Sequence, residues 1–251
     1  MSKIKSGDIF TNSQGYACKV LEYKNSAQVV VQFEDEHKHI ATVRATHLRS
    51  GGFKNPFHKS CHGVGYIGVG EYSTNPDSEA REAYLKWRRI LERCYSTSEK
   101  TRQQCASYDD CEVHPDWHNF QNFARWCVNQ KHYGKEYEID KDILAFGSKI
   151  YSEDTCCLVP KKLNNISTYL RTVGVEAWQG IRYDNKYKKY QAKISMDGYV
   201  KHIGSYNSLS DAKDAYIAHK KLFLRNMAIV YRDYIESKVF NALYNWTEVH
   251  Q

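Results

Sequence analysis

The sequence predicts an α+β fold distributed over several small domains. Residues 3–54 are rich in β-forming side chains, residues 79–129 carry apolar residues at helical spacing, and residues 180–206 alternate between polar and apolar. The 251 residues could form one large domain or two to three small ones, and the 20 Tyr, 9 Phe and 5 Trp can fill several modest cores. The change of pattern along the chain favours several cores.

Residues 1–60 are predicted to form a small β-barrel. Two β-rich segments, residues 29–33 and 40–44, follow turn residues that include Gly15 and Asn25. This size and strand spacing suit an SH3-like or Tudor-like fold, whose members bind many kinds of ligand, so no ligand is assigned. The glycine-containing residues 61–78 are expected to be a linker.

Residues 79–172 are predicted to form a central domain. It opens with a helix over residues 79–95, in which Ala83, Trp87 and Ile90 fall on one face, and continues with a helix over residues 120–129. We expect the aromatic residues of these helices to belong to the core rather than to stack on nucleic-acid bases.

The second half of this domain has the order strand, loop, strand, helix. Asp140 ends the first strand, Lys141 follows it, and Asn164 and Asn165 lie at the helix. An acid and an amide in this order can hold a divalent ion against a phosphate. This order resembles the layout of a ββα-metal nuclease centre, and the resemblance implies that Asp140 and Asn164 are the candidate ligands of Mg²⁺ or Mn²⁺ and that Asp140, Lys141, Asn164 and Asn165 are the candidate catalytic residues.

Residues 84–166 resemble the central part of phage-encoded HNH endonucleases, which have a ββα-metal centre. The resemblance rests on Trp87, Arg93, Cys94, Tyr95, Tyr108, Cys111, Glu112, Val113, Trp117, Phe120, Phe123, Ile139, Asp140, Lys141, Asp142, Gly147, Tyr151, Ser152, Cys156 and Asn164. It implies that Asp140 is the strand ligand and that Asn164 or Asn165 is the helix ligand.

The general-base histidine of that family is not found in its expected place. Lys141 stands there, and a lysine cannot act as a base unless its pKa falls by several units, although it could hold a phosphate. His114, His118 or His132 could enter from outside the motif. Active metal nuclease and inactive DNA-binding relative therefore both remain open.

Residues 173–225 are predicted to form a three-stranded antiparallel sheet packed on a helix. Turns are expected at Asn185 and at Asp197 with Gly198, and Ser208 is expected to cap the helix. The helix should present Ala212, Ala215, Tyr216 and Leu222 to the sheet. Residues 226–251 are expected to be a helical extension, with a helix over about residues 225–246 that carries Ile229, Val239, Leu243 and Trp246.

This sheet and helix resemble the Apetala-two (ethylene-response-factor) DNA-binding domain. The resemblance rests on Gly180, Ile181, Arg182, Tyr190, Gln191, Ala192, Lys193, Ile194, Ile203, Gly204, Ser205, Tyr206, Asp211, Ala212, Ala215 and Tyr216. It implies that the face opposite the helix enters the major groove, with a target sequence different from that of the plant proteins. The candidate DNA-binding residues are Arg182, Lys186, Lys189, Gln191, Lys193, Ser195, Lys201 and His202.

Charge and cysteine content bear on the partner and the compartment. The net charge is +7, and residues 169–251 hold 13 Lys and Arg against 8 Asp and Glu, which favours a phosphate backbone or simply a solvated surface. The eight cysteines include no C-x-x-C pair, so reduced thiols are expected. A zinc site from Cys111, His114 and His118, with Cys105, is disfavoured against core and surface roles.

The sequence thus predicts a double-stranded DNA-binding protein related to HNH homing endonucleases, in the cytoplasm of a phage-infected bacterium and without a membrane segment. Metal-dependent nicking or cleavage stays open. The alternative is a non-enzymatic binder of RNA, a host protein or a ribonucleoprotein. Apetala-type domains bind as monomers, so a monomer is compatible with the resemblance.

Overall fold

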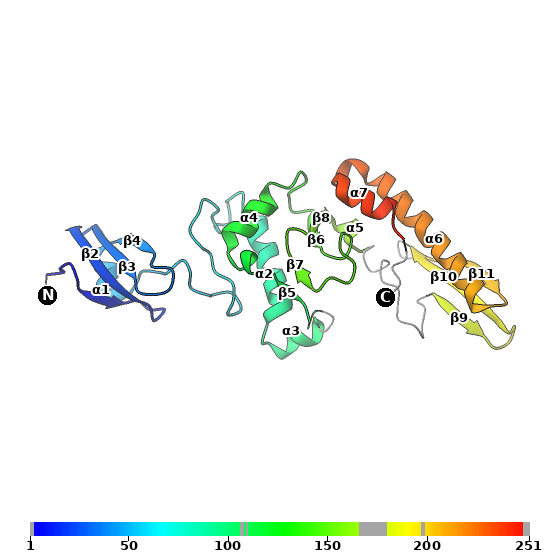
Figure 1. Ribbon diagram of the computed structural model, residues 1–251, viewed down its shortest axis with the longest axis horizontal. Helices are drawn as coiled ribbons and strands as arrows, with labels where there is room; N and C mark the ends of the chain where they lie inside the picture. The colour runs from blue at the N-terminus through cyan, green and yellow to red at the C-terminus, as the bar shows by residue number, and fades with distance from the viewer. Residues whose placement is uncertain (1–2, 106–107, 109, 166–179, 197–198, 248–251) are drawn as a thin grey trace.

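The computed structural model describes residues 3–105, 108, 110–165, 180–196 and 199–247, and Figure 1 shows the N-terminal strands at one end of the long axis and the C-terminal sheet at the other. Helices alternate with several separate small sheets, which confirms the α+β class. In the described part of the chain, no helix has the length and apolar character needed to cross a membrane.

The N-terminal unit is an open antiparallel sheet with a short helix. Its elements are β1 (Ile9–Thr11), β2 (Ala17–Asn25), β3 (Gln28–Phe33), β4 (Ile40–Val43) and α1 (Ala45–Ser50), with strand order β1-β2-β3-β4. The expected small barrel is not a closed one in the described residues, because β1 and β4 remain the two edges of the sheet. Four strands are too few to close around a core, and α1 instead adds Ala45 and Leu48 to it.

The central unit is built on two helices, as the spacing of apolar residues predicts. Its elements are α2 (Arg81–Tyr95), α3 (Glu99–Gln104), β5 (Glu112–Val113), η2 (Pro115–His118) and α4 (Phe120–Val128). Trp87 is fully buried, and its indole N–H donates to the Trp117 carbonyl at 2.7 Å. The aromatic residues Trp117, Phe120 and Phe123 share this core, which confirms their expected role.

The strand–loop–strand–helix order of the second half is confirmed. β6 (Tyr137–Asp140) pairs antiparallel with β8 (Cys157–Pro160), and α5 (Lys161–Asn164) follows directly. Between the strands, β7 (Ile150–Tyr151) pairs in parallel with β5. The loop is therefore attached to the helical half of the central unit.

The C-terminal sheet consists of β9 (Ile181–Asp184), β10 (Lys189–Met196) and β11 (Tyr199–Tyr206), in the order β11-β10-β9, with α6 (Leu209–Val230) packed on one face. The hydroxyl of Ser208 accepts the Asp211 N–H at 3.1 Å, which confirms the predicted cap. The predicted turn at Asp197 and Gly198 lies outside the described residues.

Two predictions for the C-terminal helices are wrong. Leu222, which was expected against the sheet, is 58% exposed, and the buried stripe of α6 instead includes Lys220, whose ammonium lies 4.7 Å from the Trp246 ring centroid. The helix expected over residues 225–246 is two helices, because α6 continues to Val230 and α7 (Ser237–Tyr244) folds back on it after η4 (Arg232–Tyr234).

The reversal of the chain after α6 forms a core shared with the central unit. Val239 and Leu243 of α7 pack with Phe223 and Leu224 of α6, and this cluster also contains Cys157, Val159 and Leu163 from β8 and α5. The first half of α6 thus supports the sheet, and its second half packs on the hairpin of β6 and β8 with α5, which we call the ββα hairpin.

Candidate nucleic-acid interface

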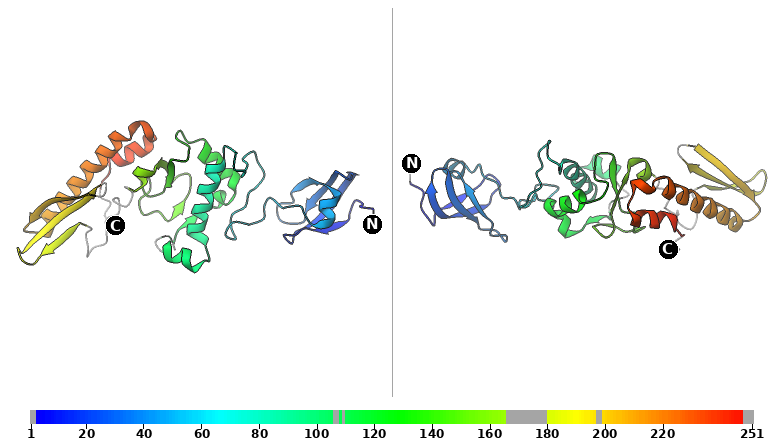
Figure 2. Two further views of the ribbon diagram at one scale, coloured as in Figure 1. Left: turned by 180° about the vertical axis from the view of Figure 1, so that it is seen from behind. Right: turned by 90° about the horizontal axis from the view of Figure 1, so that it is seen from above.

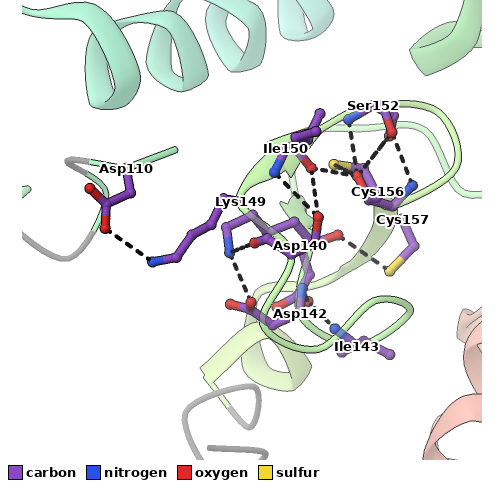
Figure 3. A network of polar contacts seen from close by, with 12 residues as sticks. Asp110, Asp140, Asp142, Ile143, Lys149, Ile150, Ser152, Cys156 and Cys157 are labelled. Atoms are coloured by element: carbon purple, nitrogen blue, oxygen red, sulfur yellow. Dashed lines mark hydrogen bonds and ion pairs between the residues drawn. The ribbon is translucent and has the colours of Figure 1, made fainter. Parts of the chain in front are cut away.

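Asp140 stands at the end of β6, as predicted, and organises the turn that follows. Its side chain is 4% exposed, and Oδ1 accepts the backbone N–H groups of Asp142 and Ile143, both at 2.8 Å (Figure 3). A carboxylate that accepts two buried amides is a strong local turn stabiliser. This oxygen is therefore committed to the loop.

Lys141 is buried and cross-links the same loop through hydrogen bonds. Its ammonium donates to Asp142 Oδ1 and to the Ser148 carbonyl, both at 2.8 Å, and its side chain is only 7% exposed. A buried ammonium needs such partners, because its desolvation is otherwise unfavourable. These contacts direct two of its three N–H groups into the protein rather than towards a phosphate.

Asn164 and Asn165 lie at the end of α5, the first half-buried and the second exposed. α5 contacts both β6 and β8, so the fold brings this helix onto the hairpin that Asp140 ends. Mg²⁺ and Mn²⁺ prefer several oxygen ligands. Asp140 Oδ1 is instead bonded to two amides and Asp142 Oδ1 to Lys141, so these two oxygens are already engaged within the loop.

The three histidines considered as a general base from outside the motif do not belong to a group of possible metal ligands among the described residues. His114 is exposed and lies 3.5 Å from Asp116, His132 stacks on Tyr137, and burial lowers the pKa of His118. Among the described residues, no three His, Cys, Asp or Glu side chains are grouped to hold a metal. Cys111, a candidate zinc ligand, is buried at 3% exposure.

The outer face of the C-terminal sheet brings several predicted DNA-binding residues together. Gln191 of β10 is paired with Arg182 of β9 and with Ser205 of β11, and directly paired residues share a face. Arg182, Lys189 and Lys193 are exposed, whereas Ala192 and Ile194, the residues on either side of Lys193, are buried on the face that α6 covers. Alternation along β10 therefore separates a basic face from an apolar face, as predicted.

Gln191 has a fixed side chain on this basic face. Its amide Nε2 donates to Asp184 Oδ2 at 2.6 Å, while Asp184 Oδ1 accepts the backbone N–H groups of Lys186 and Tyr187 at 2.9 and 3.2 Å. Asp184 thus links the β9–β10 turn to Gln191. Asp184 was not among the residues predicted for the site, although its position seven residues before Gln191 in a hairpin is the signal for such a cross-strand contact.

The far end of the sheet separates the remaining candidates. His202 is paired with Lys193 and shares its face, but Lys201 is paired with Ile194, so Lys201 lies on the face that α6 covers although its side chain is exposed. The backbone of Ser195 pairs with Val200, but its side chain lies outside the described residues. Of the predicted set, Lys201 is therefore the one that the strand register places on the opposite face.

The β9–β10 turn extends the basic face. Lys186 and Lys188 are exposed there, and Lys188 has a positive φ of 52°. Tyr187 is 63% exposed, with the Lys186 ammonium 5.1 Å from its ring centroid. Tyr187 and Lys188 are additional candidates that were not predicted from the sequence. Their signal was an aromatic residue within a run of lysines at a turn.

Comparison with protein-family models, curated proteins and solved structures gives no significant match for this chain. The geometry of the sheet and of the ββα hairpin is therefore the basis on which its function is argued.

Proposed function

We propose that this protein binds double-stranded DNA through the outer face of the β9–β10–β11 sheet. The observation that carries the proposal is the exposed set Arg182, Lys189 and Lys193 on one face of a sheet whose other face is buried against α6. The positive charge of residues 169–251 supports the same partner, because Lys and Arg release counterions from the DNA backbone.

The dimensions of the sheet suit the major groove. Neighbouring strands lie about 4.8 Å apart, so three strands span about 10 Å between the outer backbones. The major groove is about 12 Å wide and admits a narrow β-ribbon. The central strand β10 would carry Lys189, Gln191 and Lys193 towards the base edges, and the turn lysines would lie near phosphates.

Gln191 is the residue on this face that is best prepared for base recognition. The hydrogen bond from Nε2 to Asp184 fixes the amide plane, and it uses one of the two N–H groups of Nε2. The second N–H and the Oε1 acceptor have the pattern that recognises adenine, while Arg182 beside it suits guanine. Asp184 acts on recognition through Gln191 and is a positioning residue.

The central unit, in this proposal, is a scaffold rather than a nuclease. The support is the use of Asp140 to hold two loop amides and the burial of Lys141 between Asp142 and Ser148. Asp140 and Lys141, two of the four candidate catalytic residues, are explained by the stability of the loop.

The test is equilibrium binding of fluorescent duplex DNA to the full chain at several salt concentrations. We expect Arg182→Ala and Lys193→Ala each to weaken binding by roughly tenfold, with a shallower salt dependence. Lys201→Ala is the matched control, because it removes the same charge from the other face of the same sheet. Unchanged affinity in both first variants, or an equal loss in Lys201→Ala, would refute binding through the outer face.

Two further arms separate the alternatives. Supercoiled DNA is incubated with Mg²⁺, Mn²⁺ or chelator, and metal-dependent nicking that disappears in Asp140→Asn would refute the scaffold role. Duplex RNA of the same sequence replaces DNA in the second arm. Tighter binding to RNA, or binding to neither nucleic acid, would refute the choice of DNA and favour RNA or a protein partner.

A further inference from the structure

A second basic site lies in the central unit, at the junction of α2 and α3 (Figure 1). A cavity of about 330 Å³ is formed there by Arg93, Cys94, Tyr95, Ser96, Thr97 and Arg102. Two of these six residues are arginines, and none carries a carboxylate. The count of 14 basic and 14 acidic residues in residues 79–168 conceals this local excess of positive charge.

The Arg93 side chain is held in place from behind. Its guanidinium carbon lies 5.5 Å from the centroid of the Tyr108 ring, and the guanidinium hydrogen-bonds the hydroxyl of Tyr151, which is 2% exposed. Among the described residues, no carboxylate lies within 4.0 Å of Arg93 or Arg102. A guanidinium has five N–H donors, so Arg93 keeps donors for a ligand after its bond to Tyr151.

The remaining polar groups of the cavity complement the arginines. The Ser96 hydroxyl oxygen accepts the Ser98 N–H at 3.3 Å, which leaves its O–H available to donate. The Tyr95 hydroxyl is occupied by the backbone of Val113. The side chains that are left are two guanidinium groups, two hydroxyls and the Cys94 thiol, and the guanidinium and hydroxyl groups are donors suited to a phosphate.

Two larger cavities of the described chain lack this character. A cavity of about 620 Å³ contains Arg125 and His114, but Asp116, Glu153 and Asp154 also line it. A groove of about 800 Å³ beside α7 combines its lysines and arginine with Asp233 and Glu236. Acidic groups in the lining repel a phosphate.

We propose that the α2–α3 cavity binds a phosphate group of the DNA backbone, as a second contact beside that of the β9–β10–β11 sheet. This inference rests on the proposed function. Phosphate contacts carry no sequence information but fix the orientation of a protein on the duplex. The central unit would thus supply register and affinity, while the sheet supplies selectivity.

The decisive variant is Arg102→Ala in the full chain, because Arg102 is exposed, no described carboxylate pairs with it, and α3 contributes no buried residue to the core. We expect about tenfold weaker binding of duplex DNA, and a slope of log affinity against log salt that is reduced by about 1. Lys100→Ala is the matched control, since it removes one exposed positive charge from the same helix outside the cavity. Equal effects of the two substitutions would overturn the proposal.

A measurement without DNA keeps this proposal separate from the proposed function. Inorganic phosphate, compared with chloride at equal ionic strength, is expected to raise the melting temperature of the wild type and of Lys193→Ala but not of Arg102→Ala. Arg93→Gln, which keeps an N–H donor for Tyr151, should also lose this effect. Phosphate stabilisation together with unchanged DNA affinity in Arg102→Ala would overturn the backbone assignment in favour of a free phosphate compound.

The two failures can be told apart. Loss of DNA binding in Arg102→Ala with no change in Arg182→Ala and Lys193→Ala supports the cavity and refutes the sheet. The reverse result refutes the cavity and leaves the sheet in place.

Discussion

At the scale of single residues, Asp140 and Lys141 show that the same residue type at the same position can serve either a catalytic or a structural role. An acid at the end of a strand is a suitable metal ligand, and it is equally a suitable acceptor for the N–H groups of the turn that follows. The contacts of Asp140 with Asp142 and Ile143, and those of Lys141 with Asp142 and Ser148, are of the second kind. The sequence alone does not distinguish these roles, because both depend on the path of the loop.

A stability measurement follows from these contacts. Asp140→Ala leaves two amides without their acceptor, so we expect a loss of about 1–3 kcal/mol in the free energy of unfolding and a melting temperature lower by several degrees. Asp110→Ala is the control, because that carboxylate is highly exposed and lies 3.9 Å from Lys149. Thermal unfolding followed by circular dichroism makes the comparison, and equal effects of the two substitutions would contradict the role of Asp140.

At the scale of elements, the edge of the C-terminal sheet depends on Gly180. Its φ is +93°, its carbonyl accepts the Lys193 N–H at 2.6 Å, and a Cβ at this position would overlap the Lys193 carbonyl oxygen. Gly180→Ala should therefore cost about 1–3 kcal/mol and loosen the pairing of β9 with β10. Amide hydrogen exchange of β10 measures this. Gly134→Ala is the control, with no atom within 4 Å of the added Cβ, and equal exchange in both variants would refute the prediction.

Local sequence patterns predicted the helices and strands better than they predicted the contacts between these elements. Helical spacing identified α2 and α4, and alternation with the Ser208 cap identified β10, β11 and the start of α6. The same patterns did not reveal that Lys220 lies in the buried stripe of α6 or that α7 reverses direction. Those features depend on contacts with Trp246 and with the ββα hairpin, which are distant in sequence. The strand register that separates Lys201 from Lys193 likewise requires the bulge beside Ala192.

At the scale of the whole molecule, the hydrophobic cores differ in whether one continuous segment of the chain forms them. The N-terminal core draws its buried residues from residues 4–53 alone, whereas α7 completes a core that includes β8 and α5. A chain ending at Val230 loses Ile235, Val239 and Leu243, each worth about 1.5–3 kcal/mol of burial, and should expose the hairpin to limited proteolysis. A chain that begins at Lys54 should keep the hairpin protected, and equal protection of both truncated chains would contradict this division.

The helix α6 packs both on the C-terminal sheet and on the ββα hairpin, so it connects these two parts rigidly. Its 22 residues extend over about 33 Å, from the back of the sheet to the ββα hairpin. A helix held by side-chain packing along its length does not bend easily, so we expect a tilt of the sheet to displace the other end of α6. We therefore expect a change in the position of the sheet to be transmitted through α6, as a force, to the hairpin that contains Asp140.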